Sequence, residues 1–227
     1  MNGKIEGLEK QIGYTFKNKQ IIKRALTHTS YANEQTIKKN GHYERLEFLG
    51  DAVLELLTSE FIYLNYPDME EGKMTKLRAA IVCEPALAQS AKQLNLSDFI
   101  LLGKGESASG GGKRDSIVSD VMEAVIGALY LDGGMNVAKE FVHKYILADI
   151  DGTKMLFDAK SALQELVQKR KGGQIIYVLL SENGPEHKKE FECAVEINGK
   201  RLGIGIGKNK KEAEQKAAAE ALLVYKN

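Results

Sequence analysis

Residues 1–150 carry a succession of amphipathic helical patterns joined by short polar segments. Apolar residues recur with helical spacing over residues 5–12, 21–26, 46–64, 75–94, 118–131 and 137–150. The third helix should end before Pro67, because a residue that precedes proline avoids helical geometry. Pro85 is a candidate interruption of the fourth. Few stretches alternate with the period of a strand, so the pattern predicts an all-α domain.

The pattern changes beyond residue 153. A helix is predicted at 159–171, then three short strands at 175–180, 191–197 and 201–206, and an alanine-rich helix at 210–225. Asn198–Gly199, between the last two strands, is a strong hairpin signal. The order α-β-β-β-α describes a small α+β domain. We therefore predict an all-α domain at 1–152 and an α+β domain at 153–227, joined by a short polar linker at 149–154.

Composition is that of a soluble globular chain, with 43% hydrophobic and 28% charged residues among 227. A formal charge of +1 for the whole chain argues against a nucleic-acid binder, but this value averages over two parts of opposite charge. Residues 1–152 carry 18 basic and 21 acidic side chains (−3), and residues 153–227 carry 14 and 10 (+4). The split suggests a basic binding module beside an acidic one.

Neither a disulfide framework nor a zinc site is expected, because the two cysteines lie far apart in the sequence. The N-terminus lacks the apolar core of a signal peptide, and no stretch approaches the roughly 18 apolar residues of a membrane span. A cytoplasmic protein with no membrane partner is therefore expected.

Carboxylates interrupt two apolar helical patterns. Glu44, Glu47 and Asp51 share one face of the first, and Asp120 and Glu123 share one face of the second. An unpaired buried carboxylate costs several kcal/mol, so these acids require partners. Ion pairs with Arg45, Lys76 or Arg78 are one interpretation. Alternatively, Mg²⁺ or Mn²⁺ would suit carboxylate and water ligation, which favours metal-assisted hydrolysis of a phosphate ester.

The glycine-rich run at 103–114 does not form a nucleotide-binding loop. Counting back from Lys113, the required first glycine falls on Ser107, and Arg114 replaces the Ser or Thr. No nucleotide cofactor is therefore expected. We predict a flexible loop, with contact between Lys113 or Arg114 and an RNA backbone as a second interpretation.

Taken together, the acidic segments 44–54 and 116–132 resemble the ribonuclease III family, and segments 25–34 and 71–78 match it in order and spacing. The resemblance covers essentially the whole chain. It implies that Glu47, Asp120 and Glu123 are metal ligands and that Asp51 positions or activates the attacking water. Glu44 and Glu71 fall where the family has supporting acids. Phe48 matches an aromatic that enters a socket on the partner of a homodimer; its alternative is an ordinary core phenylalanine.

Residues 158–223 resemble a double-stranded-RNA-binding domain. Such a domain places its first helix and a loop in successive minor grooves and its lysines on the phosphates between them, over about 16 base pairs. The resemblance implies minor-groove contacts by Gln164, Glu165, Gln168 and His187, and phosphate contacts by Lys208, Lys210 and Lys211. Two departures are a missing proline before Tyr177 and Asn209 where serine is frequent.

These features predict a Mg²⁺-dependent endoribonuclease for double-stranded RNA, with Mn²⁺ able to substitute. The family implies 5′-phosphate and 3′-hydroxyl ends, a short 3′ overhang and processing of ribosomal precursors. A non-catalytic double-stranded-RNA-binding regulator with structural acids is the alternative. A third class, a nucleotide phosphohydrolase, would act on mononucleotides and would not need residues 153–227.

Overall fold

The computed structural model describes residues 2–37, 41–148, 150, 159–170, 172–185 and 189–225. The chain divides into two compact units, residues 1–150 and 151–227, and each is described by itself. The predicted domain boundary between residues 152 and 153 lies outside the described residues, as does most of the predicted linker.

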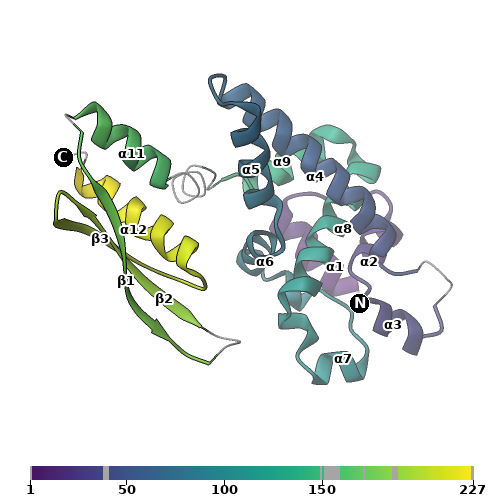
Figure 1. Cartoon of the computed structure of the whole chain (residues 1–227). Coiled ribbons are helices and arrows are strands. Elements are labelled where there is room, and N and C mark those ends of the chain that lie inside the picture. The colour runs from purple at the N-terminus through teal and green to yellow at the C-terminus, as the bar shows by residue number, and fades with distance from the viewer. Residues whose placement is uncertain are drawn as a thin grey trace. The chain divides into compact units, whose positions relative to one another are not determined.

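In the described part of the first unit, all named elements are helices, and one isolated parallel β-bridge joins Thr27 to Leu101 (Figure 1). Its helices are α1 Asn2–Ile12, α2 Lys19–Ala25, α3 Thr29–Glu34, α4 Glu44–Asn65, α5 Glu71–Val82, α6 Glu84–Gln93, α7 Lys104–Ala108, α8 Asp115–Gly133 and α9 Met135–Tyr145, with 3-10 turns at Leu96–Asp98 and Gly111–Lys113. Helix α8 packs against α2, α4, α6 and α9. It is therefore buried on most sides, as its nearly continuous apolar sequence predicts.

Several helix bounds differ from the predictions. The helix expected at 75–94 is two helices, because Pro85 occupies the first turn of α6 and Cys83 before it is extended. Helix α9 ends at Tyr145 rather than at residue 150. The short helix α3 has no counterpart in the prediction.

The prediction that the glycine-rich run forms a loop is wrong. The segment folds into α7 and a 3-10 turn, and Gly111 is buried against the Glu106 side chain. Arg114 pairs with Glu106 at 2.9 Å, which ties the end of the segment back to its helix. The glycine content suggested a loop. The packing of Gly111 against Glu106 could not be predicted from composition alone.

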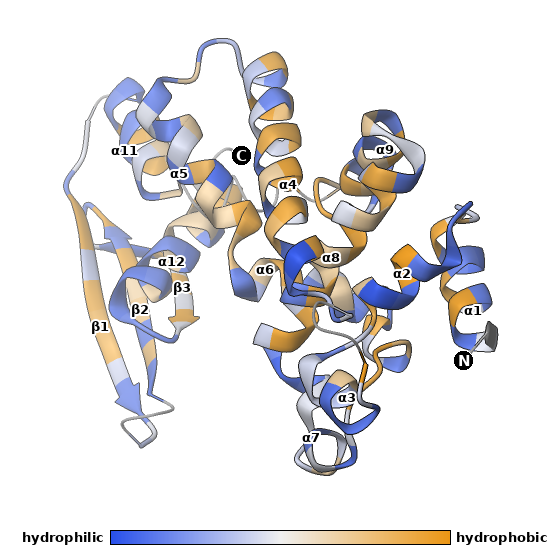
Figure 2. Cartoon of the chain, turned by 90° about the vertical axis from the view of Figure 1, so that its right-hand side faces the viewer, coloured by the Kyte–Doolittle hydropathy of each residue, from blue (hydrophilic) through white to orange (hydrophobic). Residues whose placement is uncertain are grey.

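The second unit consists of α11 Ala159–Lys169, β1 Ile175–Asn183, β2 Glu190–Ile197, β3 Lys200–Gly207 and α12 Lys210–Tyr225. The antiparallel sheet has the order β1-β2-β3. Asn198 and Gly199 both have positive φ, at 51° and 78°, as the predicted hairpin turn requires. Hydrophobic colour along β1 gives way to hydrophilic residues at its end (Figure 2). The predicted fold class, all-α followed by α-β-β-β-α, is confirmed.

Strand β3 and helix α12 approach each other at the level of their backbones. Gly203, Gly205 and Gly207 alternate along β3, and a Cβ added at any of them would overlap the backbone of α12. The facing helix contributes small residues, including Ala213 and Ala217, both fully buried. The alanine-rich sequence of α12 therefore allows the helix to lie directly on the sheet.

Candidate active site and RNA-binding surface

The two acidic helices of the first unit cross at a pair of glycines. A Cβ at Gly50 of α4 would overlap the carbonyl oxygen of Glu123 on α8, and one at Gly127 of α8 would overlap that of Leu46 on α4. Only glycine allows backbones to come this close. Glu47 and Asp51 flank Gly50, and Glu123 lies one turn before Gly127. The crossing therefore brings the acid pairs of the two helices together.

The pKa shifts of the acids report this proximity. Burial raises the pKa of Glu47 to about 7, and the Asp120 carboxylate adds to the effect. Burial likewise raises the pKa of Glu123 to about 8, with Asp51 and Glu47 as further causes. The pKa of Asp120 is also raised, mainly by burial. The structure thus brings together the four acids predicted to form the site, Glu47, Asp51, Asp120 and Glu123. The charge of Glu44 also contributes to the raised pKa values of Glu47 and Asp120.

The described lysines and arginines do not compensate these charges. In the described part of the chain, no ion pair joins Glu47, Asp51, Asp120 or Glu123 to a basic side chain. Arg78, one of the expected partners, instead donates to Ser59 Oγ at 3.0 Å. The interpretation of the acids as structural ion pairs therefore has no support.

The chemistry of the donor set fits a hard divalent cation, which prefers oxygen ligands. Within the described ranges, no three acidic, histidine or cysteine side chains are already gathered in a metal-binding arrangement. The four carboxylates share one region without forming a closed cage. A cation would relieve the repulsion from neighbouring carboxylates that adds to the effect of burial on the pKa values of Glu47 and Glu123.

Tyr43, which was not predicted from the sequence, contacts the acidic cluster through Asp120. Its side chain is 5% exposed, and its hydroxyl donates to Asp120 Oδ2 at 3.1 Å. Its backbone N–H donates to Thr27 O at 3.0 Å, and its ring packs on the His28 imidazole with centroids 5.7 Å apart. Burial and the Asp120 carboxylate raise the pKa of the Tyr43 hydroxyl, which therefore stays protonated as a donor. Segment 25–34 thus helps to build the site.

Glu71 lies apart from the four acids. It begins α5, accepts a hydrogen bond from Thr75 Oγ1 at 2.9 Å and lines a cavity of about 360 Å³ between α4 and α5. It is not among the causes of any pKa shift in the cluster. Of the two expected supporting acids, the structure brings only Glu44 to the site.

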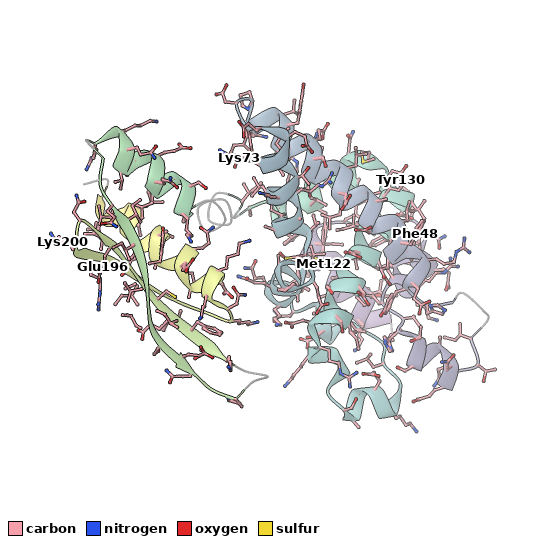
Figure 3. The ribbon with its side chains drawn as sticks, viewed as in Figure 1. Phe48, Lys73, Met122, Tyr130, Glu196 and Lys200 are labelled. Atoms are coloured by element: carbon pink, nitrogen blue, oxygen red, sulfur yellow. The ribbon has the colours of Figure 1, made fainter. Side chains whose placement is uncertain are left out.

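Phe48 is 81% exposed on α4, which rules out the interpretation of a core residue in this chain (Figure 3). Leu56 and Tyr63 on the same helix are 57% and 70% exposed. Their spacing from Phe48 places all three near one face of α4. The helix therefore presents an apolar stripe to the surroundings of the unit.

The expected RNA contacts of the second unit lie on its surface. Gln164, Glu165 and Gln168 are exposed on α11, whereas Leu163 and Val167 on the same helix are buried. The lysines at positions 208, 210 and 211 are exposed around the start of α12. His187 lies outside the described residues.

Asn209 caps α12. Its Oδ1 accepts a hydrogen bond from Glu212 N at 2.9 Å, and Glu212 Oε2 accepts one from Lys208 N at 3.0 Å. Asparagine is as good an N-cap as serine, so this departure from the family pattern preserves the helix start. The lysines consequently stand beside the positive end of a helix, where phosphate binds readily.

Comparison with known proteins agrees with this arrangement. Residues 18–150 match a family model described as Ribonuclease-III-like. This chain belongs to the ribonuclease III family. Residues 159–225 match a second model, the double-stranded RNA binding motif. The "Ribonuclease 3" of Geobacillus thermodenitrificans is 49% identical over 221 residues, which cover 96% of this chain and 90% of that protein. The "Ribonuclease 3" of Bacillus velezensis is 50% identical over 216 residues, covering 94% and 87%.

Among solved structures, the nuclease domain of ribonuclease III from Campylobacter jejuni resembles the chain with a TM-score of 0.59 and 44% identity. The match covers 63% of this chain and 96% of that domain. As a ribonuclease III family member with an RNA-binding motif, the chain is an endoribonuclease of double-stranded RNA, as the sequence predicted. Membership also implies a divalent metal, without specifying which. Among the described helices, none has the length and apolarity to cross a membrane.

Proposed function

We propose that this ribonuclease III uses Mg²⁺, with Mn²⁺ able to substitute, and that Glu47, Asp120 and Glu123 hold the ion. The observation that carries the proposal is the meeting of carboxylates at the α4–α8 crossing without a basic partner among the described residues. Mg²⁺ is usually held by a few carboxylates together with water and substrate phosphate, which suits an open cluster. When bound, the ion would activate a water molecule and offset the charge that develops on the phosphate.

Asp51 is proposed to position or activate the attacking water. Its side chain is exposed, whereas Glu47 and Glu123 are partly buried, so Asp51 lies where solvent reaches the cluster. A carboxylate there can accept a hydrogen bond, and then a proton, from the water that attacks phosphorus. Glu44 is proposed to add negative charge from the same helix. Glu71 lies apart from the four acids in this chain, and its role as a supporting acid is proposed from the family pattern alone.

For the second unit, we propose the same RNA contacts that the sequence predicts. Gln164, Glu165, Gln168 and His187 would lie in minor grooves, and Lys208, Lys210 and Lys211 on phosphates. The exposed positions of the described members support this assignment.

We also propose a homodimer in which Phe48 enters a socket on the partner. The exposed apolar stripe on α4 supports this assembly. The Campylobacter nuclease domain is described as structurally flexible in a region involved in dimer formation. Two sites related by two-fold symmetry would cut opposite strands and leave a short 3′ overhang, with 5′-phosphate and 3′-hydroxyl ends. Cytoplasmic processing of ribosomal RNA precursors is the proposed role.

The test compares cleavage of a long RNA duplex by the wild type, Glu123→Gln and Asp115→Asn, with and without Mg²⁺. Asp115 is a matched control, because it is an acid of the same helix that is exposed and paired with Lys92 at 2.6 Å. Wild type and Asp115→Asn should cleave only with Mg²⁺, and Glu123→Gln should bind the duplex without cutting it. Uncut RNA in every lane with binding retained would overturn the catalytic assignment. Turnover of mononucleotides without duplex cleavage would favour a phosphohydrolase.

A further inference from the structure

We propose that Tyr43 is a positioning residue for Asp120: its hydroxyl holds one carboxylate oxygen so that the other faces the cluster. The inference rests on the proposed metal site and extends it to a side chain outside the acidic set. The hydrogen bond runs from Tyr43 Oη to Asp120 Oδ2 at 3.1 Å. In the described part of the chain, the Asp120 carboxylate accepts no other hydrogen bond. Its orientation therefore depends on this one donor.

Tyr43 is itself held in place. It directly precedes α4, and its N–H donates to Thr27 O at 3.0 Å. Thr27 is 1% exposed and bridges in parallel to Leu101, whose N–H donates to Leu26 O at 2.8 Å. The His28 ring covers one side of the tyrosine. A phenol buried by its neighbours and tied through its backbone can fix the orientation of a carboxylate across 77 positions of sequence.

The position of the bond explains why orientation would matter. The charge of Asp120 contributes to the raised pKa values of Glu47 on α4 and of Glu123 on α8, so Asp120 lies close to an acid of each helix. If one oxygen is engaged by the hydroxyl, the other is left for a shared cation. Partners that orient a metal ligand from outside typically change metal affinity or activity by about 10–100-fold when removed.

Tyr14 provides a matched control. Its hydroxyl also donates to a carboxylate of α8, Asp132 Oδ2, at 2.8 Å. Asp132 lies at the far end of that helix and also accepts from the backbone of residues 17 and 18. Tyr14→Phe therefore removes the same chemical group at similar geometry, away from the cluster.

The experiment measures Mg²⁺ affinity of the RNA-free protein by calorimetry, and Mn²⁺ affinity by electron paramagnetic resonance. Tyr43→Phe should bind either ion about tenfold more weakly than the wild type, and Tyr14→Phe should bind like the wild type. Each titration is run below the measured melting transition of the variant. Equal affinity of Tyr43→Phe and wild type would overturn the inference, as would equal weakening by both substitutions.

A second measurement covers the case in which Tyr43→Phe does not fold. With 3-fluorotyrosine at position 43, the ring and hydroxyl remain, and the fluorine resonance should shift on Mg²⁺ titration. A resonance indifferent to Mg²⁺ would contradict the inference. Wild-type duplex cleavage is measured in parallel: if it fails, the proposed function is wrong, whereas normal cleavage with unchanged Tyr43→Phe affinity rejects only the role of Tyr43.

Discussion

Gly127→Ala tests whether the glycine crossing sets the geometry of the acids. The added Cβ would lie 3.1 Å from Gly50 N and 3.2 Å from the carbonyl carbon of Leu46, and would overlap the attached oxygen. An ordinary C···O contact is about 3.3 Å, so the helices must separate by a displacement on the order of 1 Å. The obstacle is backbone on a core helix and cannot rotate aside as a side chain would.

The magnitude follows from two opposing effects. Alanine favours the helix by about 1 kcal/mol over glycine. Overpacking a core costs about 1–3 kcal/mol of stability. Because the added Cβ would overlap backbone atoms, its cost lies at or above the upper end of this range. We expect net destabilisation of about 2 kcal/mol, which for a protein of this size lowers the melting temperature by about 4–8 °C. Misplacing catalytic groups by about 1 Å can cost about 100-fold in rate, so kcat should fall by roughly that factor.

The assay combines thermal unfolding with duplex cleavage at saturating RNA and Mg²⁺. Gly72→Ala is the control, because it lies in α5 and nothing stands within 4 Å of the added Cβ. Its stability and rate should match or exceed those of the wild type. Wild-type stability and rate in Gly127→Ala would refute the view that the glycines set the separation of the acid pairs.

Three further predictions follow from the site and its surroundings. In the folded state the pKa of Glu47 is raised from 4.5 to about 7 and that of Glu123 from 4.5 to about 8. The stability that these two carboxyl groups contribute is therefore fully present below about pH 4.5 and is lost as the pH rises through about 7 and 8. EDTA-treated protein should therefore unfold more easily at pH 8.5 than at pH 6 and regain stability with Mg²⁺; a flat pH profile in calorimetry would contradict this. Lys210→Ala with Lys211→Ala should weaken duplex binding and reduce the slope of log affinity against log salt by about 2, and an unchanged slope would remove the phosphate assignment. Phe48→Ala should shift sedimentation toward monomers, whereas an undisturbed dimer would mean that Phe48 is dispensable for association.

Sequence periodicity predicted much of this site, but not how its halves meet. The spacing of Glu47 with Asp51, and of Asp120 with Glu123, already placed each pair on one helical face. Periodicity within one helix cannot reveal which faces touch across the fold. That information resides in Gly50 and Gly127, whose significance appears only when the backbones are seen together.

Tyr43 was missed for a similar reason. Its contact with Asp120 spans 77 positions, and nothing local distinguishes it from an ordinary buried tyrosine. Conversely, Pro85 carried a local steric signal, and the interruption it suggested is present. Features set by neighbouring residues could therefore be predicted from the sequence, whereas contacts between distant segments could be seen only in the folded structure.

The backbone contact between β3 and α12 implies an unusual response of the RNA-binding unit to mutation. Most cores suffer when side chains are trimmed, because lost methylenes leave cavities. Here the facing positions are glycine and alanine, so little volume remains to lose and almost any change adds atoms. A saturation library over Gly203, Gly205, Ala213 and Ala217 should therefore be depleted of larger residues in proportion to their size. The central helix of the nuclease unit should show the opposite spectrum, with its large buried side chains intolerant of truncation.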